Sequence, residues 1–375
     1  MINRILSTVI KEKLGKQKAI IILGARQVGK STLLKMLYDK NQESILYWDG
    51  DEPDIRQMLE NITSTELKKF IGSSKIIVID EAQRIKNIGI TLKLIVDKIP
   101  EVQLLASGSS ALELANGINE PLTGRKYEFI LMSLSTQEMV NYHGLIDEKR
   151  LLQHRLIYGF YPDIVTKSGD EQINLKNLTN SYLYKDIFNF KDVRKPEIIY
   201  KLIKALALQI GSEVSYLELA QVAGCDSSTV QRYVDLLEKT FIVFRLPSFN
   251  RNVRNELKKS RKIYFYDNGI RNAILGDYKN INLRNDIGAL WENFLVSERL
   301  KFLENNQIQI SSHFWRTKQQ QEIDYIEEKD DVLYAYEFKW KTNKEAHFAK
   351  TFRDAYPNHV TKTITPDNYI EFLTN

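Results

Sequence analysis

Residues 19–38 read AIIILGARQVGKSTLLKMLY, and this stretch decides how the first third of the chain folds. The apolar run Ala19–Leu23 predicts a buried strand, and the residues that follow Lys30 predict a helix. Between them, Gly24–Ser31 fits the pattern G-x-x-x-x-G-K-[ST] of a phosphate-binding loop. A strand before this motif and a helix after it are the context that a genuine P-loop requires.

The composition of this loop predicts how it holds a nucleotide. Its glycines let backbone N–H groups curl around phosphate oxygens, and the start of a helix favours an anion. We expect Lys30 to reach the β- and γ-phosphates of ATP, and the Ser31 hydroxyl to bind magnesium. The residues expected to bind the nucleotide are Gly24, Ala25, Arg26, Gln27, Val28, Gly29, Lys30, Ser31 and Thr32.

A second apolar strand, KIIVIDE at residues 75–81, ends in two adjacent carboxylates. In a parallel sheet with the P-loop strand, we expect Asp80 to hold magnesium through water and Glu81 to activate the attacking water. Glu81 is the residue that separates hydrolysis of ATP from binding alone. The sequence therefore predicts an ATPase.

Two further polar positions have an ambiguous role. The apolar run Val102–Ala106 leads into four residues, Ser107 to Ser110, of which one can contact the attacking water or the γ-phosphate. The same serines can instead cap the helix expected at Ala111–Ala115. Arg125 follows a glycine and can stabilise the transition state from the same or a neighbouring subunit, or it is a surface residue.

The pattern of apolar residues changes twice along the chain. Short apolar strands alternate with helical patterns in the first 145 residues, which predicts a parallel sheet with helices on both faces. The pattern is then mostly helical until strands return at Phe241. We expect a P-loop core at 1–145, a helical lid or linker at 146–195, a winged helix-turn-helix at 196–262 and a small α/β domain at 263–375.

Composition limits the class of protein. The 375 residues are 43% hydrophobic and 27% charged, which is ordinary for a globular protein of two or three domains. The apolar runs are far shorter than the roughly 20 residues that span a membrane, and the first residues do not resemble a signal peptide. A lone Cys225 excludes an internal disulfide framework and a multi-cysteine zinc site. We predict a cytoplasmic protein with no membrane association.

The middle of the chain contains a helix-turn-helix pattern. Ser215–Val222 and Ser227–Lys239 read as two helices joined by a tight turn at Gly224, with a helix before them and a strand after them. The segment 245–262 carries seven basic residues and one acidic residue. Such a segment fits the DNA backbone, whereas a solvated loop or a protein-interaction module is the alternative. The residues expected to contact DNA are Arg251, Arg254, Lys258 and Lys259.

A second group of polar residues lies near the C-terminus. Asp324 belongs to one predicted strand, and Glu337 and Lys339 end the next. Alternate residues of a strand share a face, so Glu337 and Lys339 point the same way. Asp324 and Glu337 can then hold magnesium while Lys339 stabilises a phosphodiester transition state. The apolar helix upstream adds Glu292 and Glu298 as further carboxylates.

Four motifs, GARQVGKS, IIVIDEAQ, LLASGSS and LTGRKYEF, resemble in this order a prokaryotic group of AAA+ ATPases fused to a C-terminal domain of unknown function. The resemblance implies an AAA+ sheet, with Ser109 as a sensor and Arg125 as a phosphate-sensing or finger arginine. It is compatible with a homo-oligomer. The C-terminal pattern resembles the PD-(D/E)XK nuclease fold, which implies Glu292, Asp324 and Glu337 as metal ligands beside Lys339. Such a domain can cleave DNA or bind it without cutting.

The expected fold is therefore a P-loop AAA+ parallel sheet, then a winged-helix module, then a small restriction-endonuclease-like α/β domain. The expected activity is ATP- and magnesium-dependent and associated with DNA. One alternative is a regulatory ATPase whose C-terminal half binds a protein partner. A P-loop kinase is the other, and the Asp80–Glu81 pair favours water over a small-molecule acceptor.

Overall fold

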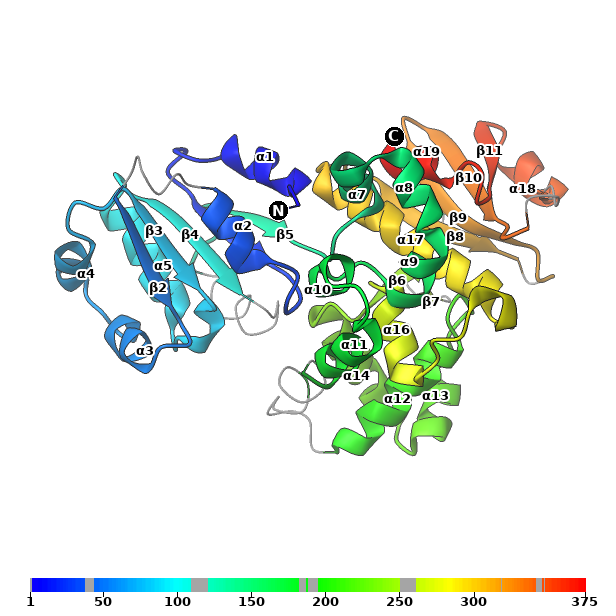
Figure 1. Cartoon of the computed structure of the whole chain (residues 1–375), viewed down its shortest axis with the longest axis horizontal. Coiled ribbons are helices and arrows are strands. Elements are labelled where there is room, and N and C mark those ends of the chain that lie inside the picture. The colour runs from blue at the N-terminus through cyan, green and yellow to red at the C-terminus, as the bar shows by residue number, and fades with distance from the viewer. Residues whose placement is uncertain are drawn as a thin grey trace. The chain divides into compact units, whose positions relative to one another are not determined.

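The computed structural model describes residues 2–37, 44–108, 121–181, 187, 195–249, 261–317, 319–341, 346 and 348–375. They form two compact units (Figure 1). The first unit is Met1–Ser133 with Lys239–Phe241, and the second is Leu134–Glu238 with Ile242–Asn375. Residues 134–145, expected in the P-loop module, thus fold with the second unit. Among the described residues, none of the helices has the length and apolar character that crossing a membrane requires.

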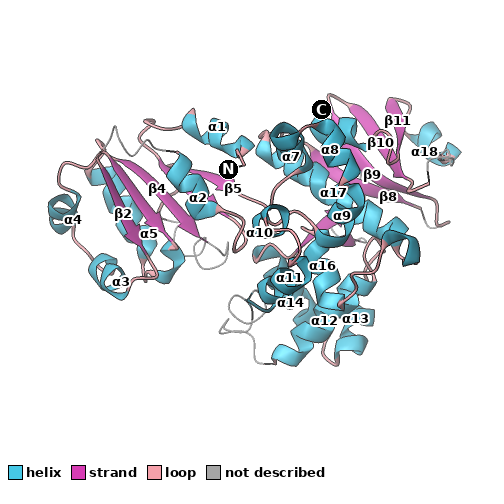
Figure 2. Cartoon of the chain, viewed as in Figure 1, coloured by secondary structure: helices cyan, strands magenta, loops and turns pink. Residues whose placement is uncertain are grey.

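The first unit is built on a five-stranded parallel sheet in the order β2-β3-β4-β1-β5. All residues of the two strands that lead to the predicted site, β1 and β3, are buried, as expected for parallel strands covered on both faces. The predicted α/β sheet flanked by helices is confirmed (Figure 2). The strands are β1 (Ala19–Leu23), β2 (Ile45–Asp49), β3 (Ile76–Asp80), β4 (Gln103–Gly108) and β5 (Lys126–Ile130).

Two helices of the first unit, α3 and α4, begin at residues that favour helix starts. Pro53 stands at the first position of α3, where its missing N–H is not needed. Thr63 and Glu66 form a reciprocal capping box at α4. The helices are α1 (Ile5–Lys11), α2 (Lys30–Met36), α3 (Pro53–Leu59), α4 (Ser64–Ile71), the 3₁₀ turn η1 (Ala82–Arg84) and α5 (Ile88–Lys98).

The second unit begins with a helical part that ends in a β-hairpin. Gly224, in the left-handed region, ends α13, and Asp226 accepts a hydrogen bond from the Thr229 amide at the start of α14. The helices are α7 (Thr136–His143), α8 (Leu145–Arg150), α9 (Leu152–Tyr158), α10 (Pro162–Thr166), α11 (Glu171–Ser181), α12 (Pro196–Leu208), α13 (Tyr216–Ala223) and α14 (Ser227–Lys239). Strand β6 (Val243–Pro247) pairs antiparallel with β7 (Arg261–Phe265), and α16 (Asn268–Leu275) and η3 (Ile281–Leu283) follow.

The rest of the second unit is a long helix, α17 (Ile287–Asn305), followed by a four-stranded sheet. The sheet order is β11-β10-β9-β8, with β8, β9 and β10 antiparallel and β11 parallel to β10. Asp330 and Asp331 have positive φ at the turn between β9 and β10, as a tight hairpin requires. The elements are β8 (Ser311–Arg316), β9 (Glu322–Lys329), β10 (Val332–Phe338), α18 (Lys350–Ala355), β11 (His359–Ile364) and α19 (Tyr369–Thr374).

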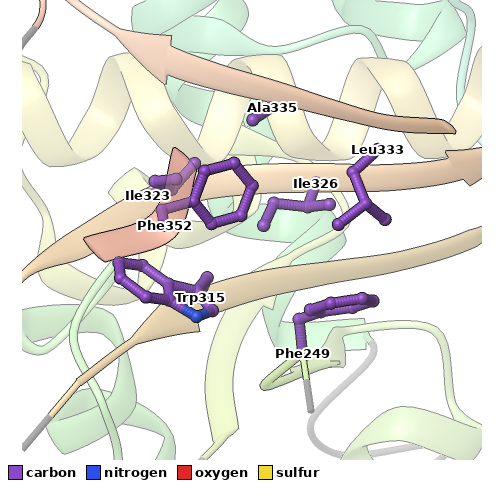
Figure 3. Close-up of a cluster of buried hydrophobic side chains, with 7 residues drawn as sticks. All are labelled: Phe249, Trp315, Ile323, Ile326, Leu333, Ala335 and Phe352. Carbon is purple, nitrogen blue, oxygen red and sulfur yellow. The ribbon is translucent and has the colours of Figure 1, made fainter. Parts of the chain in front are cut away.

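One face of this sheet carries an apolar core that joins three parts of the second unit (Figure 3). Strand residues such as Ile323 and Ile326 pack with Phe352 of α18 and with Phe249, which follows β6. The Phe249 amide also donates to the Phe314 carbonyl of β8 at 2.6 Å. The chain after hairpin strand β6 is therefore anchored on the C-terminal sheet.

Candidate functional site

The predicted P-loop joins β1 to α2, and two of its glycines are needed for different reasons. A Cβ at Gly24 would lie 2.1 Å from the Leu131 carbonyl oxygen, so only glycine permits this close approach of the backbone. Gly29 precedes α2 with φ 97° and ψ 27°, in the left-handed region. The two glycines thus fix the loop's path from strand to helix.

Lys30 lies inside the curve of this loop. Its side chain is buried, and Nζ donates to the carbonyl oxygens of Gly24 at 3.0 Å and Ala25 at 2.8 Å. The amine is thereby held among the backbone groups that would surround phosphate oxygens. A P-loop lysine at this place acts as a point charge for the β- and γ-phosphates.

Arg4 supports the P-loop, and sequence reasoning missed it. Its buried guanidinium donates to the Val28 carbonyl at 2.8 Å and to the Met132 carbonyl at 2.8 Å. It therefore ties the loop to the segment that follows β5. No motif marks this arginine, because its partners are backbone carbonyls and one of them is far away in the sequence.

Asp80, at the end of β3, is held by hydroxyls from both neighbouring strands. The Tyr47 hydroxyl of β2 lies 2.5 Å from Oδ2, and the buried Ser107 hydroxyl of β4 donates to Oδ1. Burial acts to raise the pKa of Asp80, but hydrogen bonds from Ser107, Ser31 and Tyr47 outweigh it and hold the pKa below its ordinary value. The ionised Asp80 carboxylate and the Ser31 hydroxyl together offer the oxygen ligands that magnesium prefers.

The polar end of β4 contributes to the site through Ser107. Besides donating to Asp80, its oxygen accepts from the Glu81 amide at 3.4 Å. Ser109, expected as the sensor, lies outside the described residues, and its role stays a prediction. Ser107, the first of the serines at this strand end, contacts Asp80.

Glu81 has an unusual backbone conformation. Its φ of 47° and ψ of 41° lie in the left-handed region, which is uncommon for residues other than glycine, asparagine and aspartate. A Cβ at Gly50 would lie 2.4 Å from the Glu81 carbonyl oxygen, so the β2 end packs directly on this turn. Oε2 of Glu81 accepts a hydrogen bond from Gln83 at 2.5 Å. Rare backbone conformations of this kind concentrate at functional sites.

Arg125 lies at the other end of the sheet from the P-loop. Its neighbour Lys126 pairs in register with Ala19, the first residue of β1, whereas the P-loop follows the last residue of that strand. Its Nε donates to Oδ1 of Asp97 at 2.6 Å, and its side chain is 41% exposed. The structure therefore does not bring Arg125 to the P-loop of its own chain, and action from a neighbouring subunit remains a prediction.

In the basic segment after α14, the structure describes some residues, which have partners within the chain, but not residues 250–260. Arg245 donates to Oε2 of Glu238 at 2.7 Å, pairs with Asp235, and donates to the Tyr216 hydroxyl at 3.1 Å. The guanidinium of Arg261 lies 4.6 Å from the centre of the Tyr216 ring. The four residues expected to contact DNA, Arg251, Arg254, Lys258 and Lys259, lie outside the described residues.

The C-terminal residues predicted to act together do lie together, but with a lysine among them that was not expected. Nζ of Lys262, on β7, lies 2.8 Å from Oε1 of Glu292 on α17 and 2.5 Å from Oε1 of Glu322 on β9. The Tyr264 hydroxyl donates to the same Glu292 oxygen at 2.6 Å. At the end of β10, Nζ of Lys339 donates to Oε2 of Glu337 at 2.6 Å.

Asp324 completes this group. Its Oδ2 accepts from the Phe338 amide at 2.8 Å and lies 4.0 Å from Nζ of Lys339. Burial raises the pKa of Glu292 to about 7 against the effect of Lys262, and burial with the neighbouring Asp324 raises the pKa of Glu337 to about 7. We call Glu292, Glu322, Asp324, Glu337, Lys262 and Lys339 the carboxylate–lysine cluster.

A divalent metal does not fit this cluster as the side chains lie. Within the described ranges, no group of three or more His, Cys, Asp or Glu side chains is arranged to hold a metal ion. Instead, lysine ammonium groups, which only donate hydrogen bonds, lie against the carboxylate oxygens. These lysine contacts argue against a metal here, and the metal role expected for Glu292, Asp324 and Glu337 stays a prediction. Glu298 lies outside the cluster, in a buried pair with Lys301.

Comparison with protein families divides the chain into three matched parts. Residues 16–140 match a family described as "AAA domain". Residues 149–280 match "Domain of unknown function (DUF8612)", and residues 287–368 match "Domain of unknown function (DUF4143)".

Curated relatives match most of the chain at low identity. An uncharacterized protein of Mycobacterium tuberculosis is 26% identical over 336 residues, which are 88% of this chain and 72% of the relative. One of Haemophilus influenzae is 25% identical over 343 residues, 84% of this chain and 80% of the relative.

Solved structures resemble the chain weakly. The RuvB Holliday junction branch migration motor of Thermotoga maritima is 16% identical, with TM-score 0.32, over 67% of this chain and 92% of that chain. Bacteroides Pif1 bound to single-stranded DNA is 17% identical, with TM-score 0.24, over 41% of this chain and 49% of that chain. The chain thus carries the P-loop in a segment that is similar to the AAA domain, and its C-terminal segment is similar to DUF4143.

Proposed function

We propose that this protein hydrolyses ATP at the P-loop of its first unit. The observation that carries the proposal is the placement of Asp80, between Ser31 of the P-loop and hydroxyls from the two neighbouring strands. Lys30, Ser31 and Asp80 would hold ATP with its magnesium ion. The ion would neutralise charge that develops on the phosphates.

Glu81 is the proposed base for the attacking water. It directly follows Asp80 at the strand end that faces the P-loop edge of the sheet, and Gln83 holds its carboxylate. A water-activating carboxylate at this position supports hydrolysis over transfer to a small-molecule acceptor, as a kinase would perform. The match of residues 16–140 to the AAA domain supports the same choice.

DNA is the proposed partner of the second unit. Helices α12, α13 and α14 followed by the antiparallel pair β6–β7 are the order of elements in a winged helix-turn-helix. Asp235 and Glu238 of α14 would repel DNA if they were unpaired, but Arg245 neutralises part of their charge. Gln231 and Arg232 of the same helix are exposed. The basic segment 250–260 adds the charge that phosphate contacts need.

The C-terminal part is proposed to bind rather than cut. Helix α17, the antiparallel strands β8–β10, helix α18 and the parallel strand β11 follow the order of a nuclease-like fold. The lysines against its carboxylates favour a binding platform over a metal-dependent nuclease. A regulatory ATPase whose second unit binds a protein partner is the alternative.

One experiment separates these functions. Phosphate release from ATP is measured for the full chain alone and with single-stranded, double-stranded or branched DNA. We expect turnover that one DNA form stimulates and that Lys30→Ala abolishes. A rate of ATP turnover that no DNA form changes, together with no DNA binding in gel shifts, would favour the protein-partner alternative. No turnover under any condition would refute the ATPase.

A further inference from the structure

Lys262 is buried at a place where three elements of the second unit meet. Its side chain is 1% exposed, and it extends from hairpin strand β7 to carboxylates on α17 and β9. A lysine is rarely buried to this extent unless its charge is paired. The ammonium lies between Glu292 and Glu322 and contacts both, as a metal ion shared by two carboxylates would.

The other carboxylates of the cluster also have partners within the chain. Nε of Arg316, on β8, lies 3.6 Å from Oε2 of Glu322, whereas Lys262 contacts Oε1 of the same carboxylate. Lys339 and the Phe338 amide serve Glu337 and Asp324. Three cationic side chains thus face four carboxylates.

Both oxygens of Glu292, whose side chain is 15% exposed, lie near other groups of the chain. Oε1 receives hydrogen bonds from Lys262 and Tyr264. A Cβ placed on Gly211 would lie 3.2 Å from Oε2, so the backbone at Gly211 lies against that oxygen. A carboxylate buried in this way is costly unless it is paired, and here the chain itself supplies the pairing.

We propose that Lys262 is a built-in cation that takes the place of a divalent metal in the carboxylate–lysine cluster and fastens hairpin β6–β7 to the C-terminal sheet. The cluster then needs no metal to fold, and the hairpin loses an anchor when the ammonium is removed. Without Lys262, Glu292 and Glu322 would face each other with one charge fewer between them. A divalent cation would then stabilise the native state, because it binds that state alone.

The same unit offers a matched control. Lys301 is also 1% exposed and pairs with buried Glu298 at 2.6 Å, and Lys301 additionally donates to the Leu134 carbonyl. Removing Lys301 also leaves a buried carboxylate without its cation. However, Glu298 lies outside the carboxylate–lysine cluster, so this loss should not create a site for a divalent ion.

The test is thermal unfolding of the full chain without nucleotide, with and without Mn²⁺. We expect no Mn²⁺-dependent shift in the wild-type protein. Lys262→Met should lower the melting temperature, Mn²⁺ should restore part of the loss, and adding Asp324→Asn should remove that restoration. Lys301→Met should lower the melting temperature with no response to Mn²⁺.

Three results would overturn the proposal. The first is a wild-type Mn²⁺ shift that Asp324→Asn abolishes, since the cluster would then be a metal site already. The second is a Lys262→Met protein as stable as the wild type. The third is a destabilised Lys262→Met protein whose melting temperature does not change when Mn²⁺ is added. If Lys262→Met does not fold, the wild-type measurement with its Asp324→Asn control still decides whether metal or lysine fills the cluster.

Discussion

The hydroxyl of Tyr47 lies 2.5 Å from Oδ2 of Asp80, so the edge strand β2 contacts the carboxylate that is expected to hold magnesium. Ser107 of β4 contacts the other oxygen of the same carboxylate. Asp80 is therefore oriented from both sides by its neighbouring strands. Tyr47 is a positioning residue, because it acts on the nucleotide site through Asp80.

Replacing Tyr47 with Phe should lower kcat by about tenfold, the lower range for losing a hydrogen bond to a charged group. Affinity for ATP without magnesium should stay unchanged, because Lys30 and the loop are untouched. Steady-state phosphate release over a series of magnesium concentrations measures kcat, and nucleotide titration without magnesium measures the affinity. Tyr127→Phe is the control and should leave kcat unchanged. Tyr127 lies on β5 beside the start of β1, and its ring contacts Lys18. An unchanged kcat in Tyr47→Phe would contradict the positioning role.

Replacing Arg4 with Ala should destabilise the first unit by about 2–4 kcal/mol, because two carbonyls buried beside the P-loop lose a charged donor. The affinity for ATP should fall as well, since the loop is no longer tied at Val28. Denaturant unfolding and nucleotide titration check the two effects. Arg150→Ala, at an exposed ion pair of the second unit, should change neither. Tight ATP binding by Arg4→Ala would show that the loop holds its shape alone.

The basic segment should act through charge alone. Replacing Arg251, Arg254, Lys258 and Lys259 together with Ala should weaken DNA binding and reduce its salt slope by up to about 4, roughly one per phosphate contact. Binding measured at several salt concentrations gives this slope. A slope equal to that of the wild type would place the DNA contact elsewhere or remove DNA as the partner.

Stability of the second unit should fall as pH rises from about 5 to about 7. Glu292 and Glu337 have pKa values raised from 4.5 to about 7 in the folded chain, so the native state binds more protons than the unfolded state in this window. Replacing both with Gln should flatten the profile there. Melting temperatures across this pH range measure the effect. A stability that rises towards pH 7 in the wild type, but not in the double Gln variant, would contradict the raised pKa values.

The sequence alone was sufficient where the evidence is local. The P-loop and the Asp80–Glu81 strand end are contiguous motifs whose neighbours are apolar runs, so the fold around them could be predicted, and their roles stay predictions. The contact between Ser107 and Asp80 could not be predicted, because it depends on the strand register that places Ile79 beside Ala106. Arg4 and Tyr47 carry no signal, since their partners are distant in sequence.

The C-terminal cluster shows the same limit. The pattern around Asp324, Glu337 and Lys339 correctly predicted that these side chains lie together. It could not predict Lys262, which reaches Glu292 from a hairpin of a different part of the chain. A short acidic pattern therefore predicted a metal site where the fold places an ammonium.

The most direct test of the central claim compares ATP turnover and ATP binding in the wild type and in Glu81→Gln. Phosphate release is measured with saturating ATP and magnesium, and nucleotide binding is measured separately. We expect Glu81→Gln to bind ATP as the wild type does and to hydrolyse it at least ~10²-fold more slowly, as the loss of a positioned base requires. Equal turnover in the two proteins would show that Glu81 is not the base, and absence of turnover in the wild type would contradict the ATPase itself.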